Sequence, residues 1–327
     1  MNLPTEEASN TPNLKSILVT GGAGFIGSNL VEELLQDQRV DKVRVLDNLS
    51  NGFMRNIDEF MSHPKFEFIE GDIRDYQTCL DACDGMNLVS HQAALGSVPR
   101  SIKDPITTDQ VNIGGTLNMF HAVKETQIER IVFAASSSTY GDSGILPKIE
   151  DEIGKPLSPY AITKYVNELY ADVFARTYSN FEYIGLRYFN VFGPKQDPNG
   201  AYAAVIPLFM KAIRLGKSAT INGDGSYSRD FTYVSNAVQA NLLSLFTTRA
   251  TAINEIYNVA FGEQTTLNEL WSMICDVKGR KIEPTYGPIR QGDIPHSQAS
   301  IEKAKKYLDY NPKIDTFRGL KLLAEKY

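Results

Sequence analysis

The stretch that decides the fold is Ser16-Ile17-Leu18-Val19-Thr20-Gly21-Gly22-Ala23-Gly24-Phe25-Ile26-Gly27. Its first five residues form a short apolar run typical of a buried strand, and residues 25–35 follow with helical spacing. Gly21, Gly24 and Gly27 have the spacing GxxGxxG. The first permits a tight turn with positive φ, the second lets the backbone approach a pyrophosphate, and the third lets the helix pack against the strand. The helix N-terminus offers unpaired N–H groups to phosphate, so this stretch predicts a dinucleotide-binding turn.

Short apolar runs keep alternating with helical patterns through the first half of the chain. Further helices are expected over residues 111–123 and 160–178 and from Ser235. Such alternation indicates an α/β fold with a Rossmann-like doubly wound parallel sheet, covered on both faces. The predicted strands are Ser16–Thr20, Val43–Asp47, Phe66–Glu70, Asn87–His91, Ile131–Ala135, Glu182–Arg187 and Ile256–Val259.

The alternation of short apolar runs with helical patterns ends after about Phe189, and a loop rich in Gly, Pro and Asn spans residues 193–200. Helices and short strands mix less regularly beyond it, which indicates a smaller, mixed α/β substrate domain. We expect the dinucleotide-binding domain to comprise residues 1–189 plus about 231–260. The substrate domain then comprises about 190–230 plus 261–327.

Composition excludes several classes of protein. The 327 residues are 42% hydrophobic and 22% charged, which is ordinary for a globular chain, and the formal net charge of −6 gives no basic footprint for nucleic acid. Three cysteines without a CxxC pair and four histidines without HxxxH spacing predict no metal site. The polar, acidic start does not resemble a signal peptide and no apolar run could cross a membrane, so we expect a cytoplasmic protein.

Two acidic residues follow predicted strands. Asp47 ends the second strand, 20 residues after Gly27, where an acid accepts hydrogen bonds from an adenosine ribose. A carboxylate there would repel a 2′-phosphate, which favours NAD over NADP. Asp72, after the third strand, could cap a turn or accept the adenine amino group, and both possibilities stay open.

A pair of residues suited to proton transfer begins the helix at 160. Tyr160 and Lys164 are spaced i,i+4 and share one helix face, with Ser158 as a good N-cap. A lysine beside a phenol is expected to lower the phenol's pKa, which makes Tyr160 a proton acceptor near neutral pH. The fifth strand runs into the serine-rich loop Ser136-Ser137-Ser138, at the edge of the sheet where ligands bind, and the run of serines leaves open which hydroxyl matters.

Taken together, these motifs resemble the extended short-chain dehydrogenase/reductase family, and within it the sugar-nucleotide 4-epimerases that act on UDP-N-acetylhexosamines. The motifs occur in the family's order and cover most of the chain: TGGAGFIG, Asp47, GDI at 71–73, HQAA at 91–94, VNIGGT at 111–116, SSSTYG at 136–141, YAITK at 160–164, LRYFNVFGP at 186–194 and SRDFTYV at 228–234.

The resemblance implies transient oxidation at C4 of the sugar. Tyr160 would take the proton of the 4-hydroxyl, Ser136 would hydrogen-bond O4 with Ser137 as a second candidate, and Lys164 would hold the nicotinamide ribose. Hydride would pass to NAD+ and return to the opposite face of the 4-keto sugar. The implied cofactor-binding residues are Gly21, Gly24, Phe25, Ile26, Gly27, Asp47, Asn48, Asn51, Gly52, Asp72, Ile73, Gln92, Tyr160, Lys164 and Val191.

The resemblance also implies a UDP-sugar site. Arg229 and Arg290 would pair with phosphate charge, and Asp293 would accept from ribose hydroxyls. Ser297 stands where glucose/galactose-only epimerases can carry a bulky Tyr, so a small Ser leaves room for a 2-acetamido group. The implied substrate residues are Gly96, Ser97, Ser136, Tyr160, Asn190, Ala204, Val205, Thr220, Asn222, Arg229, Arg290, Asp293 and Ser297.

Other activities of the same family stay open. A UDP-uronic acid 4-epimerase fits the motifs, as does activity on UDP-Glc and UDP-Gal. A dehydratase or decarboxylase is disfavoured because Ser136-Ser137-Ser138 holds no carboxylate. A non-catalytic NAD-binding sensor is disfavoured by the intact Ser136, Tyr160 and Lys164. The resemblance further implies a homodimer, with Val166, Leu169, Val173, Leu117 and Phe120 as candidate contacts.

Overall fold

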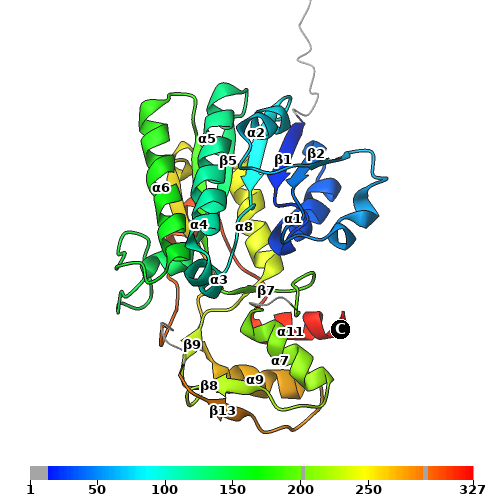
Figure 1. Ribbon diagram of the computed structural model, residues 1–327, viewed down its shortest axis with the longest axis vertical. Coiled ribbons are helices and arrows are strands. Elements are labelled where there is room, and N and C mark those ends of the chain that lie inside the picture. The colour runs from blue at the N-terminus through cyan, green and yellow to red at the C-terminus, as the bar shows by residue number, and fades with distance from the viewer. Residues whose placement is uncertain (1–13, 200–202, 290–293, 327) are drawn as a thin grey trace, which may run out of the picture.

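A seven-stranded parallel sheet forms the centre of the computed structural model, which describes residues 14–199, 203–289 and 294–326. Its strand order is β11-β6-β5-β4-β1-β2-β3 (Figure 1). The α/β doubly wound fold expected from the sequence is therefore confirmed, with each strand within three residues of its predicted bounds. The strands are β1 Lys15–Thr20, β2 Val40–Asp47, β3 Phe66–Glu70, β4 Leu88–His91, β5 Arg130–Ser136, β6 Tyr183–Tyr188 and β11 Glu255–Val259.

Helices cover both faces of this sheet. On one face lie α1 (Phe25–Gln36), α8 (Val234–Phe246) and α10 (Glu302–Leu308). The other face carries α2 (Tyr76–Cys83), α5 (Thr116–Glu125) and α6 (Pro159–Thr177). Short helices α3 (Val98–Lys103) and α4 (Pro105–Asp109) connect β4 to α5 and contact α6.

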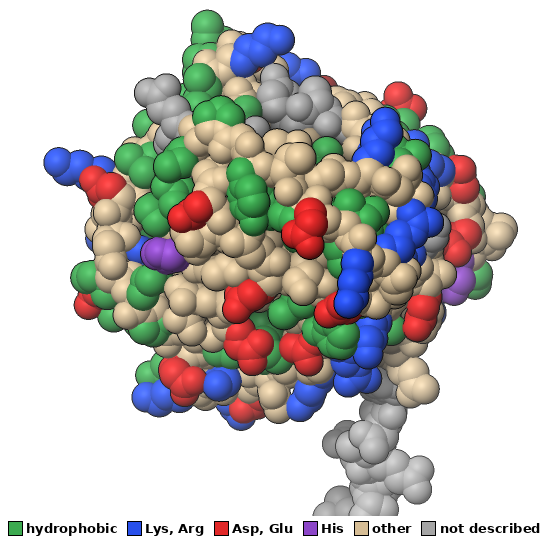
Figure 2. All heavy atoms as spheres, turned by 90° about the horizontal axis from the view of Figure 1, so that it is seen from below, with side chains coloured by type: hydrophobic (Ala, Val, Ile, Leu, Met, Phe, Trp, Pro, Cys, Tyr) green, Lys and Arg blue, Asp and Glu red, His purple; other side chains and the backbone are tan. Residues whose placement is uncertain are grey.

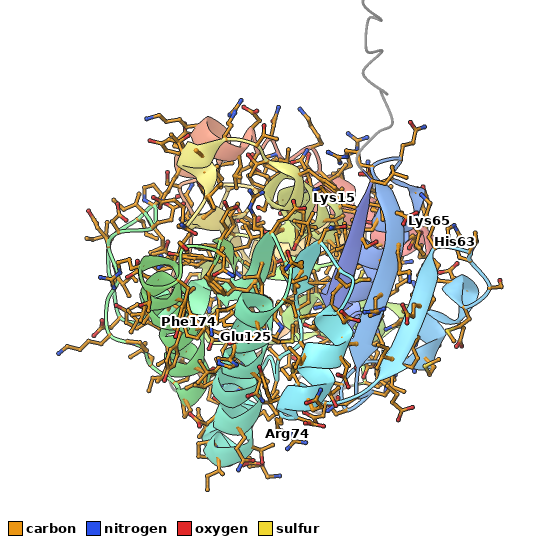
Figure 3. The ribbon with its side chains drawn as sticks, turned by 90° about the horizontal axis from the view of Figure 1, so that it is seen from above. Lys15, His63, Lys65, Arg74, Glu125 and Phe174 are labelled. Carbon is orange, nitrogen blue, oxygen red and sulfur yellow. The ribbon has the colours of Figure 1, made fainter. Side chains whose placement is uncertain are left out.

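Alternation along β1 shows how the sequence builds the two cores. Ile17 and Val19 face the α1 and α8 side, whereas Leu18 faces the α2 and α5 side, and all three are fully buried. A parallel strand buried on both faces needs such a continuous apolar run. On the second face Phe120, Phe174 and Phe181 pack ring against ring, and Figure 3 labels Phe174 on α6 beside α5.

One predicted helix begins differently. Residues 110–115 form a π-helical turn, and α5 starts only at Thr116. The side chain of Asn112 explains the distortion, because its Oδ1 accepts from the Leu95 amide at 2.8 Å while its Nδ2 donates to Thr163 Oγ1 at 3.1 Å. These partners lie outside the helix, where helical periodicity carries no information about them. Such π-helical turns are frequent at functional sites.

The remaining elements lie beyond the carboxyl ends of the sheet strands, in the lower part of Figure 1. Short strands pair there as β7 with β10, β9 with β12 and β8 with β13. The predicted two-domain boundaries stay a prediction. In the three described ranges no helix is long and apolar enough to cross a membrane. The elements are β7 Val191–Phe192, α7 Val205–Arg214, β8 Thr220–Asn222, β9 Ser228–Arg229, β10 Thr232–Tyr233, β12 Thr265–Thr266, α9 Leu267–Val277, β13 Thr285–Gly287 and α11 Thr316–Glu325.

Candidate active site

A cavity of about 630 Å³ opens at the carboxyl ends of the sheet strands. Its walls come from the loop after β1, the loop after β2, the segment between β4 and α3, the end of β5 and the start of α6. In a doubly wound sheet this edge is where ligands bind. Seen from below, acidic, basic and apolar side chains are interspersed over the surface (Figure 2).

The turn after β1 has the geometry that its glycines predicted. Gly21 has φ +69°, and a Cβ there would lie 2.6 Å from the backbone nitrogen of Ala93. A Cβ on Gly27 would lie 2.2 Å from the carbonyl oxygen of Gly21. The first glycine therefore makes the turn possible, and the third lets α1 approach it. Gly24 is the N-cap of α1 and offers no side chain to the first N–H groups, which leaves them available to an anion.

Asp47 lies at the end of β2 and lines the cavity. Its Oδ2 accepts from the Ala23 amide at 2.9 Å, and its Oδ1 accepts from the Leu49 amide at 2.8 Å. Burial raises the pKa of this carboxyl, and the two backbone hydrogen bonds oppose that rise. The carboxylate thus joins the phosphate-binding turn to the next loop, and each oxygen keeps capacity for a further donor such as a ribose hydroxyl.

Asp72 caps a turn, which is one of the two possibilities its position suggested. Its Oδ1 accepts from the Arg74 amide at 2.9 Å, and Asn48 Nδ2 donates to its Oδ2 at 2.8 Å. The side-chain hydrogen bond from Arg74 lowers the pKa of Asp72 to about 2. Asp72 also lines the cavity, so the contact with adenine stays a prediction.

Tyr160, Lys164 and Ser136 meet at one wall of the cavity. Ser158 caps α6, because its Oγ accepts from the Ala161 amide at 3.1 Å, so the helix starts beside the sheet edge. Lys164 Nζ donates to the carbonyl oxygen of Ala134 at 2.9 Å, which fixes the ammonium against β5. Burial lowers the pKa of Lys164 to about 8.

The pKa of Tyr160 departs from the expectation. Burial raises it, and a hydrogen bond with Ser136 opposes the rise. The expected lowering by Lys164 is therefore not what the structure shows, because burial of the phenol is the largest influence on its pKa. Both candidate hydroxyls, those of Ser136 and Ser137, lie at the cavity wall, so the choice between them stays open.

All of the predicted cofactor residues line the cavity, namely Gly21, Gly24, Phe25, Ile26, Gly27, Asp47, Asn48, Asn51, Gly52, Asp72, Ile73, Gln92, Tyr160, Lys164 and Val191. Their roles toward NAD remain predictions. Their fit to a dinucleotide is supported by the turn at Gly21, into which no side chain would fit, and by the open N-terminus of α1.

The predicted substrate residues divide into two sets. Gly96, Ser97, Asn190 and Ala204 line the cavity, together with Ser136 and Tyr160. Within the described residues the cavity wall does not include Val205, Thr220, Asn222, Arg229 or Ser297. Arg290 and Asp293 lie outside the described residues. The steric role of Ser297 therefore stays a prediction.

Sequence reasoning missed a polar network at the cavity wall, which joins the predicted residue Gln92 to Tyr188, Asn241 and Ser90. The hydroxyl of Tyr188 donates to Gln92 Oε1 at 3.1 Å and accepts from Asn241 Nδ2 at 2.7 Å. Gln92 Nε2 donates in turn to Ser90 Oγ at 3.0 Å. The chain positions of these residues differ by up to about 150, so no local pattern could have joined them.

His91, from the HQAA motif, lies fully inside the protein. Its ring nitrogens hydrogen-bond with Thr20 Oγ1 at 2.7 Å and Thr116 Oγ1 at 3.0 Å. Burial, together with the positive charge of Lys164, lowers the pKa of His91 to about 3. The imidazole is therefore neutral and ties β4 to β1 and α5.

Residues 17–260 match the model of the NAD dependent epimerase/dehydratase family. The chain belongs to this family. Its cofactor is NAD, as the turn after β1 and Asp47 predicted. The chain is 34% identical over 305 residues to a UDP-glucose 4-epimerase of Mycolicibacterium smegmatis, covering 93% of this chain and 95% of that one.

Solved structures are similarly close. A UDP-N-acetylglucosamine 4-epimerase from Methanobrevibacter ruminantium M1, in complex with UDP-N-acetylmuramic acid, is 40% identical with a TM-score of 0.90, covering 96% of this chain and 98% of that one. A UDP-glucose 4-epimerase from Thermotoga maritima with UDP-glucose is 37% identical with a TM-score of 0.88, covering 95% and 97%. A UDP-glucuronic acid 4-epimerase from Bacillus cereus, with UDP-glucuronic acid and NAD, is 29% identical with a TM-score of 0.87, covering 95% and 98%. These relatives share the fold and a nucleotide-sugar 4-epimerase name, and differ in the sugar.

Proposed function

We propose that this protein interconverts UDP-GlcNAc and UDP-GalNAc by transient oxidation at C4 of the sugar. The observation that carries the chemistry is the meeting of Tyr160, Ser136 and Lys164 at one wall of the cavity. The acetylated sugar is supported by the 40% identity to an enzyme named for UDP-N-acetylglucosamine and by the small residue at 297.

Tyr160, Ser136 and Lys164 have separate roles in this reaction. Tyr160 accepts the proton of the sugar 4-hydroxyl and later returns it, while Ser136 holds O4 through its hydrogen-bonding hydroxyl. Bound NAD supplies a hydride acceptor and donor for C4. Lys164, fixed by the Ala134 carbonyl, keeps a positive charge at this wall at neutral pH, which favours the phenolate of Tyr160.

The wall beside Tyr160 favours epimerisation over elimination of water. Elimination needs an additional acid and base, and residues 136–138 at the end of β5 are all serines. A UDP-uronic acid substrate is the second candidate, because a relative at 29% identity is named for UDP-glucuronic acid. UDP-Glc and UDP-Gal are further candidates, since two relatives are named for UDP-glucose.

The experiment that tests this proposal compares kcat/KM for UDP-GlcNAc, UDP-Glc and UDP-GlcA. We expect UDP-GlcNAc to be the best substrate. Ser297→Tyr should lose activity on UDP-GlcNAc and retain it on UDP-Glc, while Ser297→Ala should keep both. Preference for UDP-Glc or UDP-GlcA in the unmodified enzyme would contradict the proposed substrate.

The same proposal includes a homodimer and a cytoplasmic location. Leu169 and Val173 on α6 are about half exposed, and Ile102 and Ile106 on the adjacent α3 and α4 are more exposed still. This apolar surface suits a second copy of the chain. Phe120, which we expected at such a contact, is instead fully buried against Phe133, Phe174 and Phe181, because α5 turns it toward the sheet.

A further inference from the structure

Arg100 is the third residue of α3, and its side chain helps to line the cavity. Ser97 caps this helix, because its Oγ accepts from the Arg100 amide at 3.2 Å. The guanidinium extends away from the helix, and its Nη2 donates to Asn51 Oδ1 at 3.0 Å. Arg100 follows β4 in the chain, and Asn51 follows β2.

The sheet order places this contact over the phosphate-binding turn. β1 lies between β4 and β2 in the sheet, so a hydrogen bond from the segment after β4 to the loop after β2 spans the carboxyl end of β1. The loop of Asn51 rests on the turn itself. The Phe53 amide donates to the Ala23 carbonyl at 3.0 Å, and a Cβ on Gly52 would lie 2.8 Å from the carbonyl carbon of Ala23.

Charge supports a role for Arg100 toward the cofactor. In the described part of the cavity wall the cationic side chains are those of Arg100 and Lys164. Lys164 lies beside Tyr160 and is hydrogen-bonded to Ala134, at the end where the sugar reacts. A dinucleotide brings two negative charges in its diphosphate, and a guanidinium is well suited to bind them.

We propose that Arg100 and Asn51 form a bridge across the bound NAD diphosphate, and that Arg100 is a cofactor-binding residue that slows NAD release. The guanidinium contacts the diphosphate from the side opposite the N-terminus of α1. NAD can leave only after the hydrogen bond between the two side chains has opened. The inference rests on NAD binding by this family and is independent of which UDP-sugar reacts.

Slow release has a clear use in this chemistry. The hydride removed from a sugar has to return to that same sugar, so the reduced cofactor must stay in place between the two transfers. A bridge from one wall of the cavity to the other provides this retention without any contact to the sugar.

The test measures NAD release rather than epimerase activity. NAD-loaded protein is diluted into excess alcohol dehydrogenase and ethanol, which convert released NAD to NADH outside the epimerase. We expect Arg100→Gln to release NAD at least about tenfold faster than the unmodified protein, as loss of a charge-assisted hydrogen bond implies. The matched control is Lys103→Gln, which removes the same charge from an exposed position of the same helix and should leave the release rate unchanged.

Three further variants separate loss of the bridge from loss of folded structure. Asn51→Ala should also speed release, and the Arg100→Gln/Asn51→Ala double variant should release NAD at less than the product of the two single effects, because the two side chains share one hydrogen bond. Arg100→Lys keeps the charge without the planar fork and should fall between the unmodified protein and Arg100→Gln. Unchanged melting temperatures exclude unfolding as the cause.

The proposal is overturned if Arg100→Gln releases NAD at the unmodified rate. An unchanged release rate together with a raised KM for the UDP-sugar would assign the guanidinium to the substrate diphosphate instead. Equal acceleration by Lys103→Gln would also overturn it, since the effect would then come from the net charge of α3.

Discussion

Glu168 and Arg187 form a buried, two-pronged ion pair, and Glu168 lies one helical turn beyond Lys164. Arg187 Nε donates to Glu168 Oε1 at 2.9 Å, and Nη2 donates to Oε2 at 2.7 Å. The two side chains are only 5% and 3% exposed. Glu168 lies on the same face of α6 as Tyr160 and Lys164, and Arg187 lies on β6, so this pair fixes α6 to the sheet.

Removing one partner should destabilise the protein strongly. Glu168→Ala leaves the guanidinium of Arg187 buried without its counter-ion, and we expect a loss of about 3–5 kcal/mol in the free energy of unfolding. Urea denaturation measures it. The control is Asp172→Ala, which breaks an exposed i,i+4 pair with Arg176 on the same helix and should cost at most about 1 kcal/mol. Similar losses in both variants would contradict the account of the buried pair.

Tyr160→Phe should separate catalysis from cofactor binding. The substitution removes only the hydroxyl, so we expect turnover to fall at least about a hundredfold while NAD remains bound. Tyr170→Phe, at a partly exposed position of the same helix, should leave turnover unchanged. Turnover and bound NAD are measured on the same samples. An NAD-binding sensor, by contrast, would keep its function in the Tyr160→Phe variant.

His91 should make the protein less stable in mild acid. Its pKa is about 3 in the folded protein against an ordinary value of 6.5. Between these values the unfolded chain binds a proton that the folded protein does not, so stability falls as the pH is lowered below about 6.5. From pH 7 to pH 5 this amounts to about 2 kcal/mol. His91→Gln should lack this component, whereas the exposed His121→Gln should retain it. Parallel pH profiles for the protein and His91→Gln would exclude the role of His91.

Gly27→Ala should abolish NAD retention. The added Cβ would lie 2.2 Å from the Gly21 carbonyl oxygen, which forces the start of α1 away from the turn. We expect little NAD per chain after gel filtration and a lower melting temperature. Gly144→Ala is the control, because a Cβ there meets no atom within 4 Å. Full NAD occupancy in Gly27→Ala would show that the turn tolerates the shift.

The apolar surface over α6 should hold two chains together. Leu169→Glu places a charge in this surface and should convert a dimer to a monomer in sedimentation velocity. The matched control is Leu208→Glu on α7, because Leu169 and Leu208 are 49% and 48% exposed. This variant should leave the dimer intact. A monomeric unmodified protein would contradict the homodimer. A dimer that survives Leu169→Glu would show that the two chains meet at another surface.

The parts of the fold that were predictable are those with local signals. The strand before Gly21 has an apolar centre, Ile17-Leu18-Val19, and the spacing of Gly21, Gly24 and Gly27 is typical of a phosphate-binding turn, so both could be predicted. Asn112 distorts its helix through partners outside that helix, and Arg100 reaches Asn51 from 49 residues away. Such contacts depend on how strands are ordered in the sheet, which periodicity does not encode.

In the candidate site, too, the features that depend on local spacing were predictable and those that depend on the whole fold were not. Tyr160 and Lys164 share a helix face, so their i,i+4 spacing was informative. The pKa of Tyr160 was predicted in the wrong direction, because it is set mainly by burial, which is a property of the whole fold and not of the helix spacing. The wall of the sugar pocket depends on loops whose path no local pattern fixes, and Ser297 remains to be tested there.

The most direct test of transient oxidation at C4 uses UDP-GlcNAc in D2O with no added NAD, followed by proton NMR. The account predicts that UDP-GalNAc signals appear and that the product keeps hydrogen at C4, because the hydride returns without exchange with solvent. No conversion by protein with NAD demonstrably bound, or deuterium at C4 of the product, would contradict it.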